Sequence, residues 1–172
     1  MATNMRNLST IEKDIPSAAG LRFGILVSEW NSEITDKLLE GALETLLKQE
    51  VSEDDIFIKN VPGSFELSIG AQFMAEYTEV DAVICLGCVI QGETPHFEYI
   101  CQAIAQGLTN VSLEYNIPVI FGVLTTSDEL QAKERSGGKH GNKGTEAAIT
   151  ALKMALLQDE MMEEDESDED DE

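Results

Sequence analysis

Residues 81–115 read DAVICLGCVIQGETPHFEYICQAIAQGLTNVSLEY, and this stretch decides the fold. Its first ten residues are almost all apolar, which is typical of a strand that is covered on both faces of its sheet. Thr94 followed by Pro95 is typical of a helix N-cap and the first helical position. From there, apolar residues recur every three or four positions, which predicts an amphipathic helix with one buried face: Phe97, Ile100, Ile104, Leu108 and Val111.

The same alternation of strand and helix continues on both sides of this stretch. Apolar runs predict strands over residues 22–28, 55–61 and 118–126, and helical periodicity predicts helices over residues 33–50, 65–77, 129–135 and 143–158. Strands that alternate with helices pair in parallel through right-handed crossovers. The sequence therefore predicts an α/β fold, a three-layer α/β/α sandwich with a four-stranded parallel, flavodoxin-like sheet. We expect an N-terminal arm over residues 1–20, one domain over residues 21–158 and a tail over residues 159–172.

The chain is strongly acidic, with 33 acids, 11 bases and a formal net charge of -22. Residues 159–172 contain 11 of the acids and no base, so 33 − 11 = 22 acids and 11 bases leave a net charge of -11 on the rest. The like charges of this tail repel one another and it has few apolar residues, which together predict disorder. Nucleic-acid binding requires a basic patch, which is not found, and no apolar run of about 18 residues suggests a membrane span.

Cysteine usage favours a reducing cytoplasm. The chain has three cysteines, Cys85, Cys88 and Cys101, and an odd number cannot all pair in disulfides. The N-terminus has no apolar segment of the kind found in secretion signals. Cys85 and Cys88 have the spacing of a redox or zinc pair, but residues three apart on a strand point to opposite faces. We therefore predict buried core cysteines, with no metal site and no disulfide framework.

Ligands of open parallel sheets bind beyond the carboxyl ends of the strands. Those ends carry an indole, hydroxyl groups, a carboxylate and an imidazole, in residues 28–31, 60–66, 91–96 and 125–127. This set suits a polar heteroaromatic or sugar-like ligand. The helix that begins near Pro95 offers free backbone amides to an anion such as phosphate, and its positive end should keep His96 neutral near pH 7. A neutral imidazole can both accept and donate a proton.

Local alternatives exist for each of these residues. His96 could be an ordinary surface residue in a first helical turn, and Trp30 could be a core or interface aromatic. Ser64 could simply cap the next helix, with Glu66 complementing the helix dipole. Residues 137–144, GGKHGNKG, lack the spacing of a nucleotide phosphate loop and do not follow the first strand.

A local concentration of cations nevertheless surrounds that glycine-rich segment. Arg135, Lys139 and Lys143 are close together in a chain with few bases, which suggests an anionic ligand, whereas His140 is interpreted as an exposed residue.

Three segments together resemble one known family. They are VPGSFEL at residues 61–67, GCVIQGETPHFEY at residues 87–99 and GGKHGNKG at residues 137–144, in order and at matching spacing between residues 22 and 158. The chain is similar to 6,7-dimethyl-8-ribityllumazine synthase, a transferase of riboflavin biosynthesis. The resemblance implies that 5-amino-6-(D-ribitylamino)uracil condenses with 3,4-dihydroxy-2-butanone 4-phosphate to the lumazine, with release of phosphate and water. It implies no metal and no organic cofactor.

The resemblance also implies roles for single residues. His96 matches the proton-transfer residue, and Trp30 matches an aromatic ring that stacks on the pyrimidine and is often phenylalanine. Ser64, Phe65 and Glu66 match residues that hold the uracil and ribityl groups. Cys88, Val89 and Ile90 match a strand end whose backbone binds the pyrimidine edge. Glu93 and Thr94 match the turn that binds the phosphate. An adjacent subunit is implied to contribute Phe121 against the heterocycle and Arg135 to the phosphate, with Lys139 and Lys143 as supporting cations.

Assembly follows from the same resemblance. Members form pentamers with sites at subunit interfaces, and many close into a 60-subunit icosahedral shell that can hold riboflavin synthase. The segment Gly138–Asn142 resembles shell-forming members, which favours the shell, whereas the acidic tail departs from the family pattern. Two other functions are less favoured. A non-catalytic flavodoxin-type module usually has a hydroxyl-rich loop after its first strand, whereas this chain has Glu29-Trp30-Asn31 there. A shell protein with a vestigial site is disfavoured by the complete set of matching residues: Trp30, Glu66, Thr94, His96 and Arg135.

Overall fold

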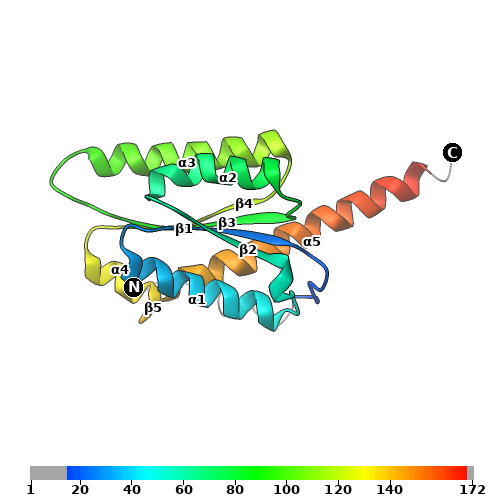
Figure 1. The fold of residues 1–172 in the computed structure, drawn as a ribbon, viewed down its shortest axis with the longest axis horizontal. Helices are drawn as coiled ribbons and strands as arrows, with labels where there is room; N and C mark the ends of the chain where they lie inside the picture. Colours follow the sequence, from blue (N-terminus) through cyan, green and yellow to red (C-terminus); the bar gives the residue numbers. More distant parts are fainter. Residues whose placement is uncertain (1–14, 170–172) are drawn as a thin grey trace, which may run out of the picture.

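Four parallel strands form the centre of the computed structural model, which describes residues 15–169, with side chains as far as Asp165. Their order across the sheet is β2-β1-β3-β4. Their bounds are β1 Phe23–Ser28, β2 Ile56–Val61, β3 Ala82–Ile90 and β4 Val119–Thr126. Helices cover both faces, so the predicted three-layer α/β/α sandwich with a four-stranded parallel sheet is confirmed (Figure 1).

The helices divide between the two faces of the sheet. One face carries α1 Ser32–Lys48, the short α4 Glu129–Glu134 and α5 Lys143–Glu169, and the other carries α2 Leu67–Tyr77 and α3 His96–Tyr115 (Figure 1). The smaller elements are η3 Glu53–Asp55, η4 Ser64–Glu66, and the antiparallel pair β5 Ser136–Gly138 and β6 Gly141–Asn142.

Strand β3 supplies side chains to a separate core on each face, because neighbouring residues of a strand point in opposite directions. Ile84, Leu86 and Cys88 belong to the core beneath α1 and α5, whereas Val83 and Cys85 belong to the core beneath α2 and α3. Cys85 and Cys88 are free and buried on opposite faces, so the prediction of core cysteines is confirmed.

Two helix starts differ from the predictions. Helix α3 begins at His96 with Pro95 at the N-cap, and no side chain, that of Thr94 included, caps it. The segment after β2 begins as the 3-10 turn η4 and becomes α-helical only at Leu67. Ser64 is the first residue of that turn and does not cap a helix, because its hydroxyl is buried and makes no hydrogen bond to any described residue.

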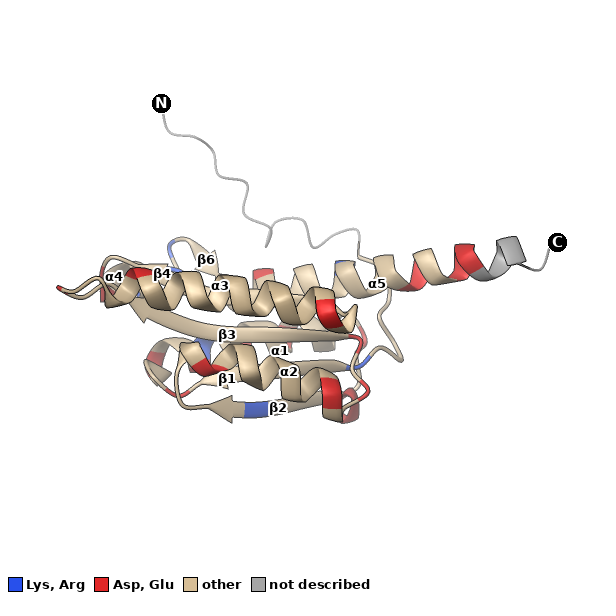
Figure 2. Cartoon of the chain, turned by 90° about the horizontal axis from the view of Figure 1, so that it is seen from above, with Lys and Arg blue, Asp and Glu red and all other residues tan. Residues whose placement is uncertain are grey.

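The C-terminal end also differs from the expectation. Helix α5 continues to Glu169, through most of the segment for which the sequence predicts disorder. No glycine or proline interrupts residues 145–172, so the chain contains no local signal that ends the helix. The extension projects beyond the sheet and carries acidic residues along its length (Figures 1 and 2). Residues 170–172 of the predicted tail lie outside the described residues.

Only the last part of the predicted N-terminal arm is described. Residues 1–14 lie outside the described residues, whereas Ala18 is buried and its N–H donates to the carbonyl of Gln49 at 3.0 Å. Within residues 15–169, no helix is both long enough and apolar enough to cross a membrane.

Candidate active site

The loop after β1 is held by both neighbouring strand ends. The N–H of Glu29 donates to the carbonyl of Val61 at 2.9 Å, and the N–H of Trp30 donates to that of Pro62 at 3.2 Å. On the other side, Asn31 Nδ2 donates to the carbonyl of Cys88 at 2.9 Å. These bonds fix the backbone of Trp30 while its indole is 73% exposed, so it is not a core aromatic.

Trp30 and Glu66 flank the same glycine. A Cβ atom placed on Gly63 would lie 3.1 Å from Glu66 Oε2 and 3.6 Å from Trp30 Cδ1. The N–H of Glu66 donates to the carbonyl of Gly63 at 3.2 Å, which closes the turn and brings the carboxylate back toward the indole. An aromatic face and a hydrogen-bond acceptor therefore lie side by side, as a polar heteroaromatic ligand requires.

The two residues between Gly63 and Glu66 point in different directions. Ser64 is buried, and its Oγ has no hydrogen-bond partner among the described residues. Phe65 is 54% exposed and adds a second aromatic ring at the same turn.

The end of β3 presents backbone groups to an open space. β3 pairs with β1 only as far as Leu86, whereas its pairing with β4 continues to Ile90. Alternate residues of a parallel strand direct both N–H and C=O to the same neighbour, so Cys88 and Ile90 face the side on which β1 has ended. The carbonyl of Cys88 already accepts a hydrogen bond from the side chain of Asn31. Ile90 therefore offers one donor and one acceptor to a ligand, and Val89 faces β4.

The loop between β3 and α3 completes this part of the site. Gln91 is anchored by its N–H, which donates to the carbonyl of Thr126 at 2.8 Å. Beyond it, Glu93, Thr94 and His96 are exposed. The first helical amide that finds a backbone partner is that of Glu98, which donates to the carbonyl of Pro95 at 3.0 Å. The preceding amides are thus available to an anion at the start of α3. We call residues 29–31, 62–66 and 88–96 the rim.

Phe121 lies apart from the rim of its own chain. It is paired with Cys85 in the middle of β4, five residues before Thr126. At about 3.3 Å per residue, that places it roughly 16 Å below the strand end, on the outer strand of the sheet. Its ring is 36% exposed at that edge.

The cations lie on the face of the sheet that α1 and α5 cover, opposite the face of α3. Arg135 ends α4, whose Ala132 is buried in the core beneath α1, whereas His96 begins α3 on the opposite face. Arg135 Nη1 donates to the carbonyl of Gln131 at 3.1 Å, and Lys143 Nζ is 3.3 Å from Glu146 Oε2. Lys139 is exposed in the turn between β5 and β6, next to His140, whose Nε2 is 3.6 Å from Glu134 Oε2. Within the described residues, Phe121 therefore lies away from the rim, and Arg135, Lys139 and Lys143 make no hydrogen bond or ion pair with it.

Asn31 is a site residue for which the sequence analysis proposes no role. It adopts the left-handed conformation at φ 60, which asparagine tolerates better than most residues, and so turns the chain sharply from β1 into α1. Asparagine directly after an apolar run is the signal that could have identified this turn.

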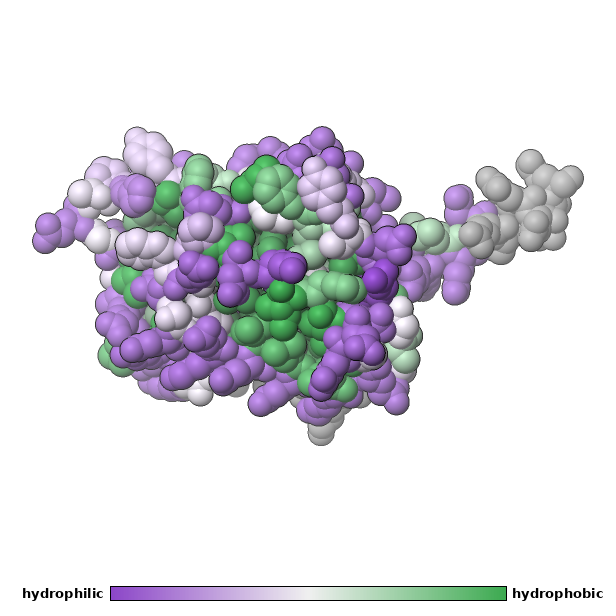
Figure 3. All heavy atoms as spheres, viewed as in Figure 1, coloured by the Kyte–Doolittle hydropathy of each residue, from purple (hydrophilic) through white to green (hydrophobic). Residues whose placement is uncertain are grey.

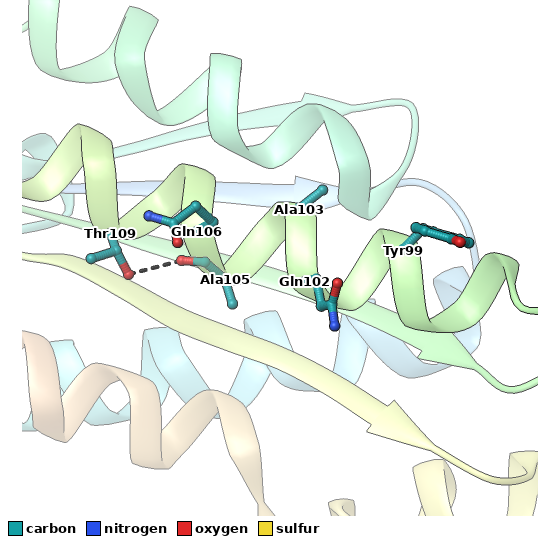
Figure 4. A pocket seen from close by; sticks show the side chains of 6 residues that line it. All are labelled: Tyr99, Gln102, Ala103, Ala105, Gln106 and Thr109. Atoms are coloured by element: carbon teal, nitrogen blue, oxygen red, sulfur yellow. Dashed lines mark hydrogen bonds between the residues drawn. The ribbon is translucent and has the colours of Figure 1, made fainter.

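A separate hollow lies on the exposed side of α3. It is a shallow depression of about 680 Å³ whose lining is uncharged: Tyr99, Gln102, Ala103, Ala105, Gln106 and Thr109 (Figure 4). It is open to water along the helix and contains none of the predicted site residues.

Comparison with known proteins identifies one family and several named relatives. The sequence model of the family described as 6,7-dimethyl-8-ribityllumazine synthase matches residues 20–159. A protein of that name from Porphyromonas gingivalis is 56% identical over 159 residues, which cover 92% of this chain and 99% of the relative. Proteins of the same name from Cytophaga hutchinsonii and Parabacteroides distasonis are 59% and 54% identical, each over 90% of this chain and 97% of the relative.

Proposed function

The chain belongs to the 6,7-dimethyl-8-ribityllumazine synthase family, and we propose that its active site forms where the rim of one copy meets the β4 edge of another. The protein condenses 5-amino-6-(D-ribitylamino)uracil with 3,4-dihydroxy-2-butanone 4-phosphate to 6,7-dimethyl-8-ribityllumazine, releasing phosphate and water. It is a transferase of riboflavin biosynthesis.

The pyrimidine substrate binds between Trp30 and the end of β3 in this proposal. The exposed indole stacks on the uracil ring, and the N–H and C=O of Ile90 pair with the complementary edge of that ring. Glu66 accepts hydrogen bonds from ribityl hydroxyls. The arrangement of Trp30 and Glu66 around Gly63 is the observation that carries the proposal, since it places a stacking surface and a polyol acceptor side by side.

The phosphate substrate binds at the start of α3. Backbone amides without helical partners and the hydroxyl of Thr94 donate to the phosphate oxygens, and the helix dipole favours their negative charge. Glu93 belongs to the same turn and orients it. His96 is the first residue of the helix and therefore lies next to the bound phosphate.

Catalysis then consists mainly of positioning and proton transfer. The primary amine of the uracil attacks the ketone, water leaves as the imine forms, and the C–O bond to phosphate breaks as a proton leaves carbon. The second amine then closes the ring with loss of water. His96 carries protons between these steps, and the two binding subsites hold the reacting groups together.

A second copy supplies the groups that the rim lacks. Phe121 lies in the middle of the outer strand β4, below the rim of its own chain, and Arg135 follows α4 on the face of the sheet opposite α3. Head-to-tail association brings them to the rim of the next copy, with Lys139 and Lys143 as supporting cations. The family acts on small molecules as a homo-oligomer, and a closed head-to-tail ring of five is the assembly we propose.

Both edges of the sheet have the apolar surface that such a ring would bury. The β2 edge, which faces the viewer in Figure 3, is hydrophobic between α1 and α2. Exposed apolar side chains on the elements that meet there are Leu47, Ile58, Ile69 and Phe73. The opposite edge exposes Phe121. Two different apolar edges favour a heterologous interface over a two-fold one.

The exposed side of α3 also supports self-association. Residues 99–113 contain no charged residue, although 26% of the whole chain is charged. Around the hollow in Figure 4, this surface is lined by glutamine, threonine and alanine side chains. Copies with a net charge of -22 can approach one another most closely where neither surface carries charge.

We further propose that pentamers close into a 60-subunit shell in the cytoplasm, with riboflavin synthase as an enclosed partner. The hairpin of β5 and β6 supports the shell, because only Lys139 and His140 separate its strands, which leaves no insertion to obstruct contacts between pentamers. Three free thiols support a reducing compartment.

Two measurements test the site. The purified protein mixed with both substrates should produce the absorbance and fluorescence of the lumazine. Co-expression of His96→Ala and Arg135→Ala chains should then yield mixed rings that are more active than either variant alone when the phosphate substrate is well below the KM of Arg135→Ala. In a random mixture, about one quarter of the interfaces combine an intact His96 with an intact Arg135.

The Arg135→Ala variant alone should mainly raise KM for the phosphate substrate. A mixed ring that is no more active than the average of the two variants would contradict a shared site, and absence of lumazine with the wild-type protein would contradict the activity.

A further inference from the structure

Gly87 of β3 lies beneath the turn that carries Phe65 and Glu66. A Cβ atom placed on Gly87 would lie 2.5 Å from Ser64 Oγ, 3.2 Å from Ser64 Cβ and 3.1 Å from Leu67 Cδ1. Real Cβ atoms essentially never approach other atoms as closely as the first of these distances. The side chain of Ser64 therefore occupies the space that any other residue at position 87 would fill.

This contact is deep in the molecule and close to the site. Ser64 is 6% exposed and Gly87 is buried. The pairing of β1 with β3 ends at Val27 and Leu86, and Gly87, the next residue of β3, points to the opposite face of the sheet, which α2 covers. The floor under η4 is thus formed by Gly87, close to the carboxyl end of β3.

The same turn connects this floor to the rim. Ser64 is directly followed by Phe65 and Glu66, and the carboxylate of Glu66 lies beside Gly63 and Trp30. Because η4 has only three residues, a displacement of Ser64 cannot be absorbed before it reaches Glu66. The depth at which Ser64 rests on β3 therefore sets the position of the carboxylate relative to the indole.

We propose that Gly87 is a positioning residue for the pyrimidine subsite: the missing side chain at this strand position holds Ser64 down and thereby fixes Phe65 and Glu66 against Trp30. This inference rests on the proposed function of the rim. It assigns no contact between Gly87 and the substrate.

The first test is Gly87→Ala. The added methyl group should lift Ser64 and η4, so KM for the pyrimidine substrate should rise by about tenfold or more, since small misplacements of binding groups have effects of that size. KM for the phosphate substrate should stay within about twofold, because the start of α3 is a different element. The emission of Trp30, the only tryptophan, should also shift.

A double-mutant cycle separates the contact from other effects. Ser64→Ala removes the oxygen closest to position 87, so the added methyl group should be tolerated far better in that background. We expect Gly87→Ala to raise KM by no more than about threefold when Ser64 is already alanine, which is strong non-additivity. If Gly87→Ala does not fold, Ser64→Thr adds a methyl group to the same contact from the other side and should produce the same rise.

Gly24→Ala is the matched control. Its added methyl group also lies under α2 on the same face of the sheet, but at the far end of β1, against the flexible side chain of Met74. It should leave KM and the emission of Trp30 unchanged.

Two results would overturn the inference: an unchanged KM and emission in Gly87→Ala, or equal effects of Gly24→Ala and Gly87→Ala, which would indicate a general loosening of α2. Failure of the proposed function is a separate result. If the wild-type protein had no synthase activity, the proposed site would be wrong. The emission of Trp30 in the double-mutant cycle of Gly87→Ala and Ser64→Ala would still decide whether Gly87 positions the turn.

Discussion

His96 is the single side chain on which turnover should depend most. His96→Ala should lower kcat by about 10-fold to 1000-fold, because one acid–base group is lost while both subsites still position the substrates. The measurement is lumazine formation at saturating concentrations of both substrates. His140→Ala is the control, since His140 lies beside Glu134 on the opposite face of the sheet, and it should leave kcat unchanged. An unaltered rate in His96→Ala would remove His96 from the mechanism.

The buried thiols should be unreactive in the folded protein. Burial raises the pKa of Cys88 from 9.0 to about 11 and raises that of fully buried Cys85 further. At pH 8 the thiolate fraction of Cys88 is therefore about 100-fold lower than that of an unperturbed thiol. Iodoacetamide should label both residues only after denaturation, as peptide mass spectrometry of native and unfolded samples would reveal. Rapid native labelling of either residue would contradict their burial.

The same burial gives stability a defined dependence on alkaline pH. A thiol whose pKa is raised in the folded state keeps its proton when the unfolded chain has lost it, so its contribution is complete below pH 9 and declines above it. For Cys88 the decline extends from about pH 9 to about pH 11. Urea midpoints measured across this range should fall, and a smaller fall is expected in Cys88→Ala.

At the scale of the element, Asn142 links the start of α5 to α1. Its Oδ1 accepts from the N–H groups of Gly144 at 2.8 Å and Thr145 at 3.3 Å, and its Nδ2 donates to the carbonyl of Lys37 at 2.8 Å. Asn142→Ala removes a helix cap and a contact between helices, which should lower the free energy of unfolding by about 1–2 kcal/mol. Urea denaturation measures this change. Lys37→Ala keeps the backbone acceptor and should have a much smaller effect; equal effects would contradict the role of Asn142.

The start of α3 illustrates how much of an element its sequence reveals. The Thr94-Pro95 pair predicted the existence and approximate start of the helix, because proline fixes φ and suits the first turn. The structure moves the start to His96 and removes the cap of Thr94. Such details depend on the path of the loop after β3, which is anchored at Gln91 by a bond to β4 and therefore follows from the packing of distant residues.

At the scale of the whole molecule, the acidic C-terminal segment should make assembly depend on salt. Residues 159–172 hold half of the net charge, since -22 + 11 = -11 without them. Exposed like charges repel across about 10 Å at 0.1 M salt and less at higher salt. Sedimentation velocity should therefore reveal smaller species of the full chain at low salt and larger ones at high salt. A chain that ends at Gln158 should sediment in the same way at both.

Replacement of the 11 acids by asparagine and glutamine keeps the length of the segment and serves as the control. It should behave like the shortened chain. Equal salt dependence in all three proteins would show that the charge of the segment does not influence assembly.

The sequence alone determined the order along the chain of the four strands of the sheet and the helices between them, because apolar periodicity is local, whereas it did not predict the β5–β6 pair or the extension of α5 to Glu169. It also identified the rim, since parallel strands end at a common edge and the residues after them can be read directly. The tertiary structure decided which of those residues meet. Strand order and register separate Phe121 from Trp30, and the packing of Ser64 on Gly87 connects residues 23 positions apart. Contacts of this kind depend on how distant segments pair, and no local pattern contains that information.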